Sequence, residues 1–440
     1  MHKIVRTAVP ALIAAVSLTA CGSGSSTDAN AGATSAPSAG ASSSAAASPS
    51  ASSSTALPAR GDADLVIWTD TGVPKYTAIK KVADAFAAQQ GIKVAVQQIS
   101  SDLQSAFVTA DAAGNGPDVV IGANDWLGNL VQNGTIEPLQ LSADQVSAYS
   151  PKAVSASTYN GQLYALPYGM ESLALFRNTA LAPTKPTTLD QAVSEGLAAV
   201  KAGKTQSALN LPVGQEGDAY HMEPLLTAGG GYLFGTKPDG SYNPDDLGIG
   251  KAGSLKAAEK IGELGKENVL RTSIDGSNAI SLFTAGKSAF LISGPWALSD
   301  VQKSGIKYDI QPVPGFAGGP AAAPFMGAQD VFVAQHAKNE AFAQEFVDNF
   351  LNTPEQMKTM YQLSEEPPSM LSLQKSVDKD AAVFAQAADQ ADPMPAIPEM
   401  QSVWEPLGKA YAAIVRGADP DSTMKKAGAA IEKSIKSSGD

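Results

Sequence analysis

Short apolar runs alternate with segments of helical periodicity along the chain from residue 65 onward. The run 65–68 (Leu-Val-Ile-Trp) indicates a buried strand, and the spacing i, i+3, i+4, i+7 that begins at Ile79 predicts a helix over 76–89. Strands at 92–99 and 118–121 and a helix beginning near Leu103 continue the pattern. This alternation predicts an α/β fold in which helices cover both faces of a parallel sheet.

The same pattern extends to the end of the chain. Strand-like segments occur at 162–176 and 288–293, and helical segments at 255–265, 341–351 and from about Met400 onward. In open α/β sheets, ligands bind beyond the carboxyl ends of the strands. The residues directly after each strand are therefore the first candidates for a binding site.

The first 61 residues do not follow this pattern. Lys3 and Arg6 precede a short apolar run and small residues that end at Cys21, which predicts a signal peptide over 1–20. The sequence Leu-Thr-Ala-Cys at 18–21 looks like a bacterial lipobox, so we expect Cys21 to be lipidated and to anchor the chain in a membrane. Residues 21–61, rich in Ser, Ala and Pro, predict a disordered tether with a reach of roughly 30–40 Å.

Charge and cysteine content exclude some classes of function. The net charge is -12 and the pI is about 4.8, and no cluster of Lys and Arg occurs, which disfavours nucleic acid as a partner. Cys21 is the only cysteine, so a disulfide within the chain is excluded and a Cys-based metal site is disfavoured. We expect no metal and no cofactor.

Aromatic and acidic residues gather at the predicted strand ends. Asp70 follows the first strand, Asp125 and Trp126 follow the third, and Trp296 follows the strand at 288–293. Trp68, inside an apolar run, is expected in the core, whereas Pro295 favours a helix start that presents Trp296 to a ligand. Asp70, Asp125, Glu171 and Asp218 are the carboxylates placed for a site. Aromatic faces beside carboxylates suit a sugar, whose C–H faces stack on rings and whose hydroxyls donate to carboxylates, although any one of these acids could equally be a solvated surface charge.

At these residues the chain resembles the maltose/maltodextrin-binding proteins, solute receptors of ATP-driven sugar importers. The likeness covers essentially the whole globular part. The matching segments are 65–68, 114–118 (Gly-Asn-Gly-Pro-Asp), 159–163 (Tyr-Asn-Gly-Gln-Leu), 170–173 (Met-Glu-Ser-Leu), 229–232 (Gly-Gly-Gly-Tyr), 292–296 (Ile-Ser-Gly-Pro-Trp) and 394–398 (Met-Pro-Ala-Ile-Pro) leading to Trp404.

The resemblance implies a two-lobed periplasmic-binding-protein fold with a ligand cleft between the lobes. The N-terminal lobe would comprise 62–170 and 328–377, and the C-terminal lobe 171–327 and 378–440. The chain would cross a hinge three times, near 169–174, 325–330 and 375–380.

The resemblance also assigns binding roles by position. Asp125 and Glu171 match carboxylates that accept hydrogen bonds from sugar hydroxyls, and Asp218 stands where the family has Glu. The remaining matches are the aromatic residues Tyr220, Trp296 and Trp404, the apolar Met394, and the polar loop that holds Asp70 and Lys75. Gly122 departs from the family, because its best-known members stack a tryptophan there, and Trp126, one turn onward, could substitute. His221 in place of an aromatic ring and Gly408 in place of a basic residue leave the exact sugar open.

The implied function is capture of maltose or maltodextrin by hinge closure, followed by delivery to the permease subunits of an ABC transporter. We expect a monomer that is lipid-anchored at the outer face of the cytoplasmic membrane. The same fold could instead bind another oligosaccharide, such as trehalose, or another solute. A secreted glycoside hydrolase is the enzymatic alternative, because paired carboxylates and aromatic residues also serve that chemistry. The pattern Gly-Ile-Gly-Lys-Ala-Gly at 248–253 resembles a dinucleotide loop but follows an apparent turn at 243–246, which favours a helix start.

Overall fold

A computed structural model describes residues 57–99, 102–238 and 240–438. The predicted signal peptide, Cys21 and most of the predicted tether lie in residues 1–56, outside the described residues. At the end of the predicted tether, Arg60 Nη2 is 2.5 Å from Asp118 Oδ2 and thereby joins this segment to the folded part. Among the described residues, none of the helices has the length and apolarity that a membrane crossing requires.

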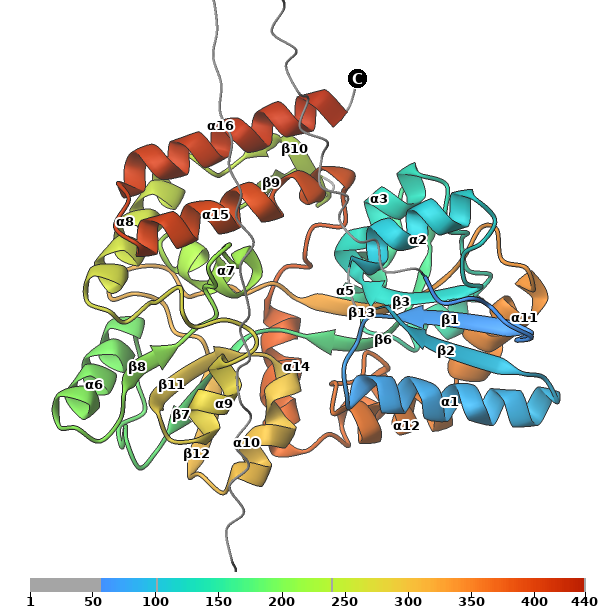
Figure 1. Cartoon of the computed structure of the whole chain (residues 1–440), viewed down its shortest axis with the longest axis horizontal. Helices are drawn as coiled ribbons and strands as arrows, with labels where there is room; N and C mark the ends of the chain where they lie inside the picture. The colour runs from blue at the N-terminus through green and yellow to red at the C-terminus, as the bar shows by residue number, and fades with distance from the viewer. Residues whose placement is uncertain (1–56, 100–101, 239, 439–440) are drawn as a thin grey trace, which may run out of the picture. The chain divides into compact units, whose positions relative to one another are not determined.

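A five-stranded sheet occupies the first part of the fold (Figure 1). Its strands, in spatial order, are β2 (Val94–Gln98), β1 (Leu65–Thr69), β3 (Val119–Ala123), β13 (Gly327–Val333) and β6 (Ala165–Glu171). β1 runs parallel to β2 and β3, whereas β13 is antiparallel to both β3 and β6. The parallel sheet predicted from the first three strands is confirmed for β1, β2 and β3. β13, which enters from the second half of the chain, is antiparallel and makes the complete sheet mixed.

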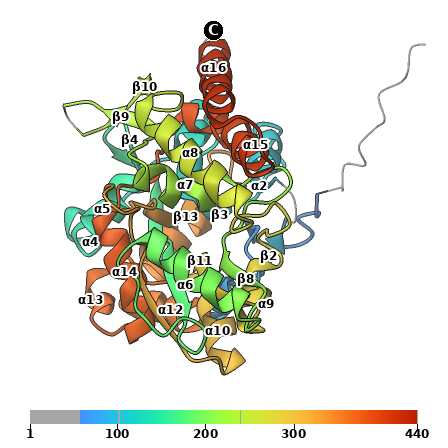
Figure 2. The same cartoon turned by 90° about the vertical axis from the view of Figure 1, so that its left-hand side faces the viewer.

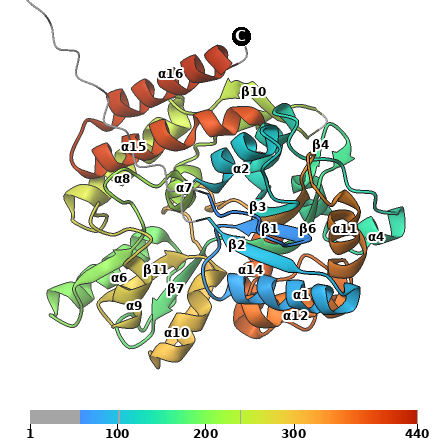
Figure 3. The same cartoon turned by 45° about the vertical axis from the view of Figure 1, so that its right-hand side comes forward.

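Helices bury both faces of this sheet, as Figure 3 shows for α1 and α12 on one side and α2 on the other. Leu65 and Ile67 of β1 pack in one cluster with α1 (Lys75–Gln90) and α12 (Pro354–Ser364). Val66 and Trp68 pack in another with α2 (Leu103–Ala112) and α3 (Leu127–Gln132). A strand buried on both faces needs apolar residues at every position, which explains the unbroken run at 65–68 and places Trp68 in the core as predicted.

A second, four-stranded sheet is also mixed. Its strands, in spatial order, are β12 (Tyr308–Pro312), β7 (Ala174–Asn178), β11 (Ser288–Ser293) and β8 (Ser207–Asn210). Leu175 and Phe290 pack toward α6 (Leu189–Lys201), which covers the sheet in the view of Figure 2. Phe176 and Leu291 pack on the other face, against α9 (Ala279–Thr284), α10 (Leu298–Ser304) and α14 (Lys379–Gln390).

The chain passes between the two sheets three times, which gives the two-lobed fold. The first passage is at Ser172 and Leu173, between β6 and β7, and the second joins β12 to β13. The third leads from α13 (Leu371–Gln374) to α14, which contacts β6, β7 and β12. The predicted strand-like segment 162–176 is therefore three strands, β5 (Gln162–Leu163), β6 and β7, in three different sheets. The assignment of flanking segments to each lobe stays a prediction.

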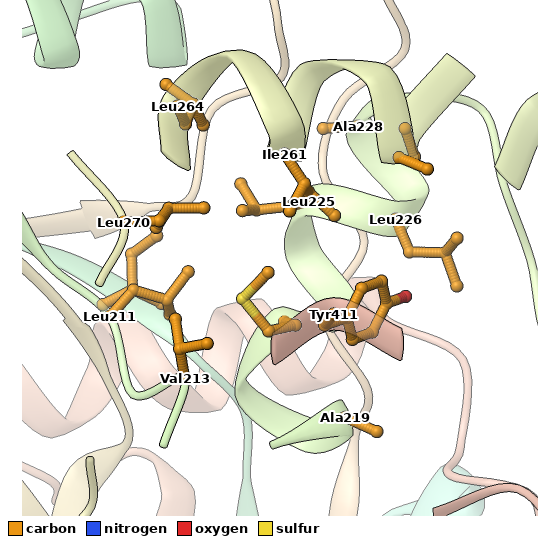
Figure 4. Close-up of a cluster of buried hydrophobic side chains, with 14 of the residues drawn as sticks. Leu211, Val213, Ala219, Leu225, Leu226, Ala228, Ile261, Leu264, Leu270 and Tyr411 are labelled. Atoms are coloured by element: carbon orange, nitrogen blue, oxygen red, sulfur yellow. The ribbon is translucent and has the colours of Figure 1, made fainter. Parts of the chain in front are cut away.

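A helical layer packs beside the second sheet. It comprises α7 (Ala219–Ala228), α8 (Ala252–Lys266), α15 (Trp404–Val415) and α16 (Pro420–Ser438). Figure 4 shows Leu225 and Ile261 in one buried cluster with Tyr411. The segment 243–246, predicted as a turn, lies instead in β10 (Tyr242–Leu247), which forms an antiparallel hairpin with β9 (Phe234–Thr236).

The helix predicted at 341–351 changes its winding midway. α11 (Glu340–Gln344) continues into a π-helical turn, η3 (Glu345–Leu351). The rings of Phe346 and Phe350 each lie 5.2 Å from the ring of Phe86 in α1, measured between centroids. The remaining short elements are β4 (Thr158–Tyr159), α4 (Ala143–Ser147), α5 (Pro151–Ala156), and the 3-10 segments η1 (Asn124–Trp126), η2 (Pro295–Ala297) and η4 (Pro398–Ser402).

Candidate ligand-binding cleft

A pocket of about 350 Å³ opens at the strand ends between the two sheets. Its lining comes from the segment after β1, from β3 and η1, from β6 and β13, and from η2 after β11. The lining residues are Asp70, Thr71, Gly72, Val73, Pro74, Lys75, Gly122, Ala123, Trp126, Glu171, Trp296 and Gln329. The volume falls in the usual range of small-molecule sites, about 300–1,000 Å³. The pocket thus brings together four of the predicted site residues, Asp70, Trp126, Glu171 and Trp296.

Two indole rings in this pocket each lie against a glycine at a strand end. A Cβ atom built on Gly122 would lie 2.1 Å from the ring of Trp126, and one on Gly294 would lie 2.2 Å from the ring of Trp296. Any side chain at either glycine would therefore displace the ring. The space left by Gly122 is occupied by the ring of Trp126.

A buried charge cluster lies at the side of the pocket. Lys75 Nζ is 3.1 Å from Glu171 Oε2 and 2.8 Å from Glu366 Oε2. Burial raises the pKa of Glu366 to about 8, the charge of Glu171 adds to the rise, and Lys75 opposes it. Burial also acts to raise the pKa of Glu171, but the charge of Lys75 and hydrogen bonds with Glu366, Lys75 and Gln329 together outweigh burial and hold that pKa below its usual range. Lys75 also lies 6.0 Å from the centroid of the Trp296 ring.

Asp125 and Trp404, both predicted to bind the ligand, bind each other. Trp404 Nε1 donates to Asp125 Oδ2 at 3.0 Å, and Gln401 donates to the backbone oxygen of Asp125 at 3.3 Å. The residue Asp125 is 6% exposed. Burial raises its pKa to about 6, although the hydrogen bond from Trp404 opposes the rise. The bond joins η1, after a strand of the first sheet, to α15 of the helical layer.

Asp218 is engaged by its own helix. Its carboxylate accepts from the backbone N–H of His221 at 2.9 Å, which caps α7, and lies 2.7 Å from His221 Nδ1. The ring of Tyr220, two residues after Asp218, lies 6.3 Å from that of Trp296 and 6.4 Å from that of Phe325. The hydroxyl of Tyr220 is buried and has no hydrogen-bond partner within the part of the chain that is described.

Met394 does not line this pocket. It is buried and lines a second pocket of about 430 Å³ together with Tyr159 and Tyr242. Its backbone oxygen accepts from Asn124 Nδ2 at 2.9 Å, which ties the segment before α15 to η1.

The sequence did not indicate Gln329, which lines the pocket, or Glu366, which lies behind it against Lys75. Gln329 lies within the apolar strand β13 and lines the pocket. Glu366 follows α12 in the segment Glu-Glu-Pro-Pro, which has the composition of a solvated loop. No local pattern distinguishes it, since its burial depends on contact with β6, almost 200 positions earlier in the chain.

Sequence comparisons match the chain to a family of known proteins. The sequence profile of the bacterial extracellular solute-binding proteins matches residues 81–386. A galactooligosaccharide-binding protein of Bacillus subtilis is 32% identical over 390 residues, which cover 85% of this chain and 90% of the relative. A maltotriose-binding protein of Pyrococcus abyssi is 26% identical over 83% of this chain and 81% of the relative. A maltooligosaccharide ABC transporter solute-binding lipoprotein of Streptococcus pneumoniae is 28% identical over 78% and 82%. The chain therefore belongs to the bacterial extracellular solute-binding protein family.

Proposed function

We propose that this protein binds an oligosaccharide in the cleft and delivers it to an ABC transporter. The observation that carries the proposal is the pocket itself, in which two indole rings and the Lys75–Glu171 pair face the same space from both lobes. An oligosaccharide offers apolar C–H faces to Trp126 and Trp296. Its hydroxyls can donate to Glu171 and accept from Lys75.

Hinge closure would couple binding to delivery. A ligand that touches both lobes stabilises the closed form more than the open one, and this shifts the population toward closure. A permease that contacts both lobes can then distinguish the loaded receptor from the empty one. The relative named as a transporter lipoprotein supports this role and the proposed lipid anchor at Cys21.

The proposed role is capture without catalysis. The relatives are named as binding proteins. Of the four predicted carboxylates, Asp125 and Asp218 are bound by neighbouring side chains, and Glu171 is paired with Lys75. A glycosidase needs one carboxyl that donates a proton at the glycosidic oxygen and another free to attack or to activate water.

Two sugars are candidates. The resemblance at the motifs favours maltodextrin, as do the relatives with 26–28% identity. Galactooligosaccharide is the second candidate, because the relative with 32% identity over 90% of its length is named for that ligand. Where the best-known maltodextrin receptors have a tryptophan, this chain has Gly122, and Trp126 supplies the aromatic ring from a different position. A different position of the ring affects which sugar can stack on it.

Titration with maltotriose and with galactotriose tests the proposal. Trp126, Trp296 and Trp404 lie in or next to the cleft, so tryptophan fluorescence should change on binding. Calorimetry gives the affinity independently. Trp296→Ala should weaken binding at least tenfold and leave thermal unfolding nearly unchanged, while Trp68→Phe, in the core, serves as a spectroscopic control. A response to neither sugar would contradict the proposal, and shorter glucan or galactan products after hours of incubation would favour the hydrolase.

A further inference from the structure

A buried carboxyl that does not line the pocket lies directly behind two residues that do. The side chain of Glu366 is 1% exposed, and its Oε2 atom is 2.8 Å from Lys75 Nζ. Lys75 is also 3.1 Å from Glu171 Oε2, and both Lys75 and Glu171 line the pocket. One ammonium group is therefore shared by two carboxyls, of which one faces the ligand and the other faces the protein interior.

The backbone holds Glu366 at this point. α12 ends at Ser364, and Glu365, which caps the helix with a φ of 61°, turns the chain. The next residues dock on β6, where Met170 N–H donates to Pro367 O at 2.8 Å. Gly169 in β6 makes room for the side chain, since a Cβ there would lie 2.4 Å from Glu366 Cγ. A glycine in the middle of an otherwise apolar strand thus has a specific packing reason.

The cluster contains more acid than base. The groups that face Glu366 are Lys75 from α1, Glu171 and Tyr168 from β6, and Tyr220 from α7. Burial raises the pKa of both tyrosines above the usual value, so neither carries charge near neutral pH. With both carboxyls ionised, the cluster would hold one uncompensated negative charge almost out of water, which is costly. A proton on Glu366 removes that charge.

We propose that Glu366 is a positioning residue that fixes Lys75 and Glu171 for the ligand and carries a proton whose loss weakens ligand binding. This inference rests on the proposed function. When Glu366 is protonated, Lys75 pairs with Glu171 and both present a neutral, polar edge to the pocket. When Glu366 is ionised, it competes with Glu171 for Lys75 and leaves a net negative charge. Closure over a sugar excludes water and makes that charge more costly.

The central experiment measures the Kd of maltotriose and of galactotriose from about pH 6.5 to about pH 9.5. The tighter-binding, protonated form is lost as pH rises through the pKa of about 8. The Kd of the wild type should therefore rise about fivefold or more over this range. Glu366→Gln mimics the protonated side chain, so its Kd should stay within about twofold of the wild-type value at pH 6.5. Glu365→Gln, the adjacent carboxyl without a contact to Lys75, is the matched control and should keep the wild-type profile.

A third variant separates positioning from charge. Glu366→Ala removes the second partner of Lys75, so binding should weaken about tenfold even at low pH, where Glu366→Gln binds normally. A wild-type Kd that is flat with pH would overturn the proposal, as would a pH-dependent rise that persists in Glu366→Gln. A flat wild-type profile would overturn the proposal even if a variant fails to fold.

The proton can also be counted without any sugar. Potentiometric titration of the free protein between about pH 9.5 and pH 6.5 should show about one more proton taken up by the wild type than by Glu366→Gln. If neither sugar binds at pH 6.5, the proposed function fails, and this count still tests Glu366. Equal proton uptake by the two proteins would show that Glu366 does not hold the proton.

Discussion

Gly122 and Gly294 each lie at a strand end beneath an indole ring, and each ring forms part of the pocket wall. Gly122→Ala would place a methyl group 2.1 Å from the Trp126 ring and force the ring away. We expect about a tenfold or greater loss of sugar affinity, because an aromatic surface of the proposed site is displaced. Calorimetric titration measures the loss, and the fluorescence of Trp126 should change in the free protein.

The control for this variant is Gly276→Ala, since Gly276 is exposed and nothing lies within 4 Å of a Cβ there. It should leave both affinity and fluorescence unchanged. Wild-type affinity in Gly122→Ala would show that the Trp126 ring does not contact the sugar.

Asp330 is a buried acid of β13 whose charge opposes folding. Its Oδ1 atom accepts a hydrogen bond from Ser157 Oγ at 2.7 Å. Burial raises the pKa of Asp330 to about 7; the hydrogen bond from Ser157 opposes this rise, and the charge of Asp125 adds to it. Because the unfolded pKa is about 4, the stabilising effect of the protonated form is complete below about pH 4 and is lost as pH rises to about 7. Asp330→Asn should therefore be more stable than the wild type by about 1–2 kcal/mol at about pH 8 and no more stable at about pH 4.

Urea unfolding at the two pH values measures this difference. The exposed Asp245→Asn should change stability little at either pH. An equal effect of Asp330→Asn at both pH values would mean that protonation of Asp330 is not the cause.

Residues of the candidate site were predictable from local sequence where they directly follow an apolar strand. Trp126 and Trp296 follow apolar strands, and the carboxyl ends of strands are where ligands bind. Asp125 was placed at the right strand end, yet its carboxylate is bound by Trp404, almost 280 positions later in the chain. Glu366 was missed for a related reason, because its burial depends on Gly169 in another element.

At the scale of elements, the contact between α1 and the π-helical turn η3 supports one face of the first sheet. Phe86 is fully buried and lies 5.2 Å from both Phe346 and Phe350. Phe86→Ala should lower the free energy of unfolding by about 3–5 kcal/mol, because it removes ring contacts and leaves a cavity. Chemical denaturation measures the loss. Leu363→Ala, on the partly exposed side of α12, should cost only about 0.5 kcal/mol. Comparable losses in the two variants would contradict the central position of Phe86.

Apolar periodicity predicted where helices and strands lie. It did not predict the type of helix or which sheet each strand joins. A helix over 341–351 was predicted from one apolar face, and that face continues through the π-helical turn without any break in the pattern. The segment 162–176 reads as one apolar stretch, although Ser172 and Leu173 carry the chain from one sheet to the next. Both strands are buried on both faces, so hydrophobicity alone gives no sign of the change.

At the scale of the whole molecule, alternating strands and helices predict the fold class but not the direction of every strand. β1, β2 and β3 are close in sequence and parallel, as the pattern indicates. β13 joins them antiparallel after the chain has built the second sheet. The passage from β12 back to β13 is one of the links between the two lobes. No local feature of the sequence predicts it, because it depends on how distant segments pack.

A ligand held between the lobes should stabilise the folded protein as a whole. At a free sugar concentration of about 100 times Kd, linkage contributes about 2.7 kcal/mol. For a chain of this length, that corresponds to a rise in Tm of about 3 °C, since the entropy of unfolding scales with the number of residues. Thermal unfolding with increasing maltotriose or galactotriose measures the shift in Tm. The shift should depend on sugar concentration as the Kd from calorimetry predicts. Sucrose at the same concentration controls for general solvent effects, and Trp296→Ala, with its at least tenfold weaker binding, should lose about half of the shift or more. An equal rise in Tm with sucrose, or in Trp296→Ala, would place the stabilising sugar outside the cleft.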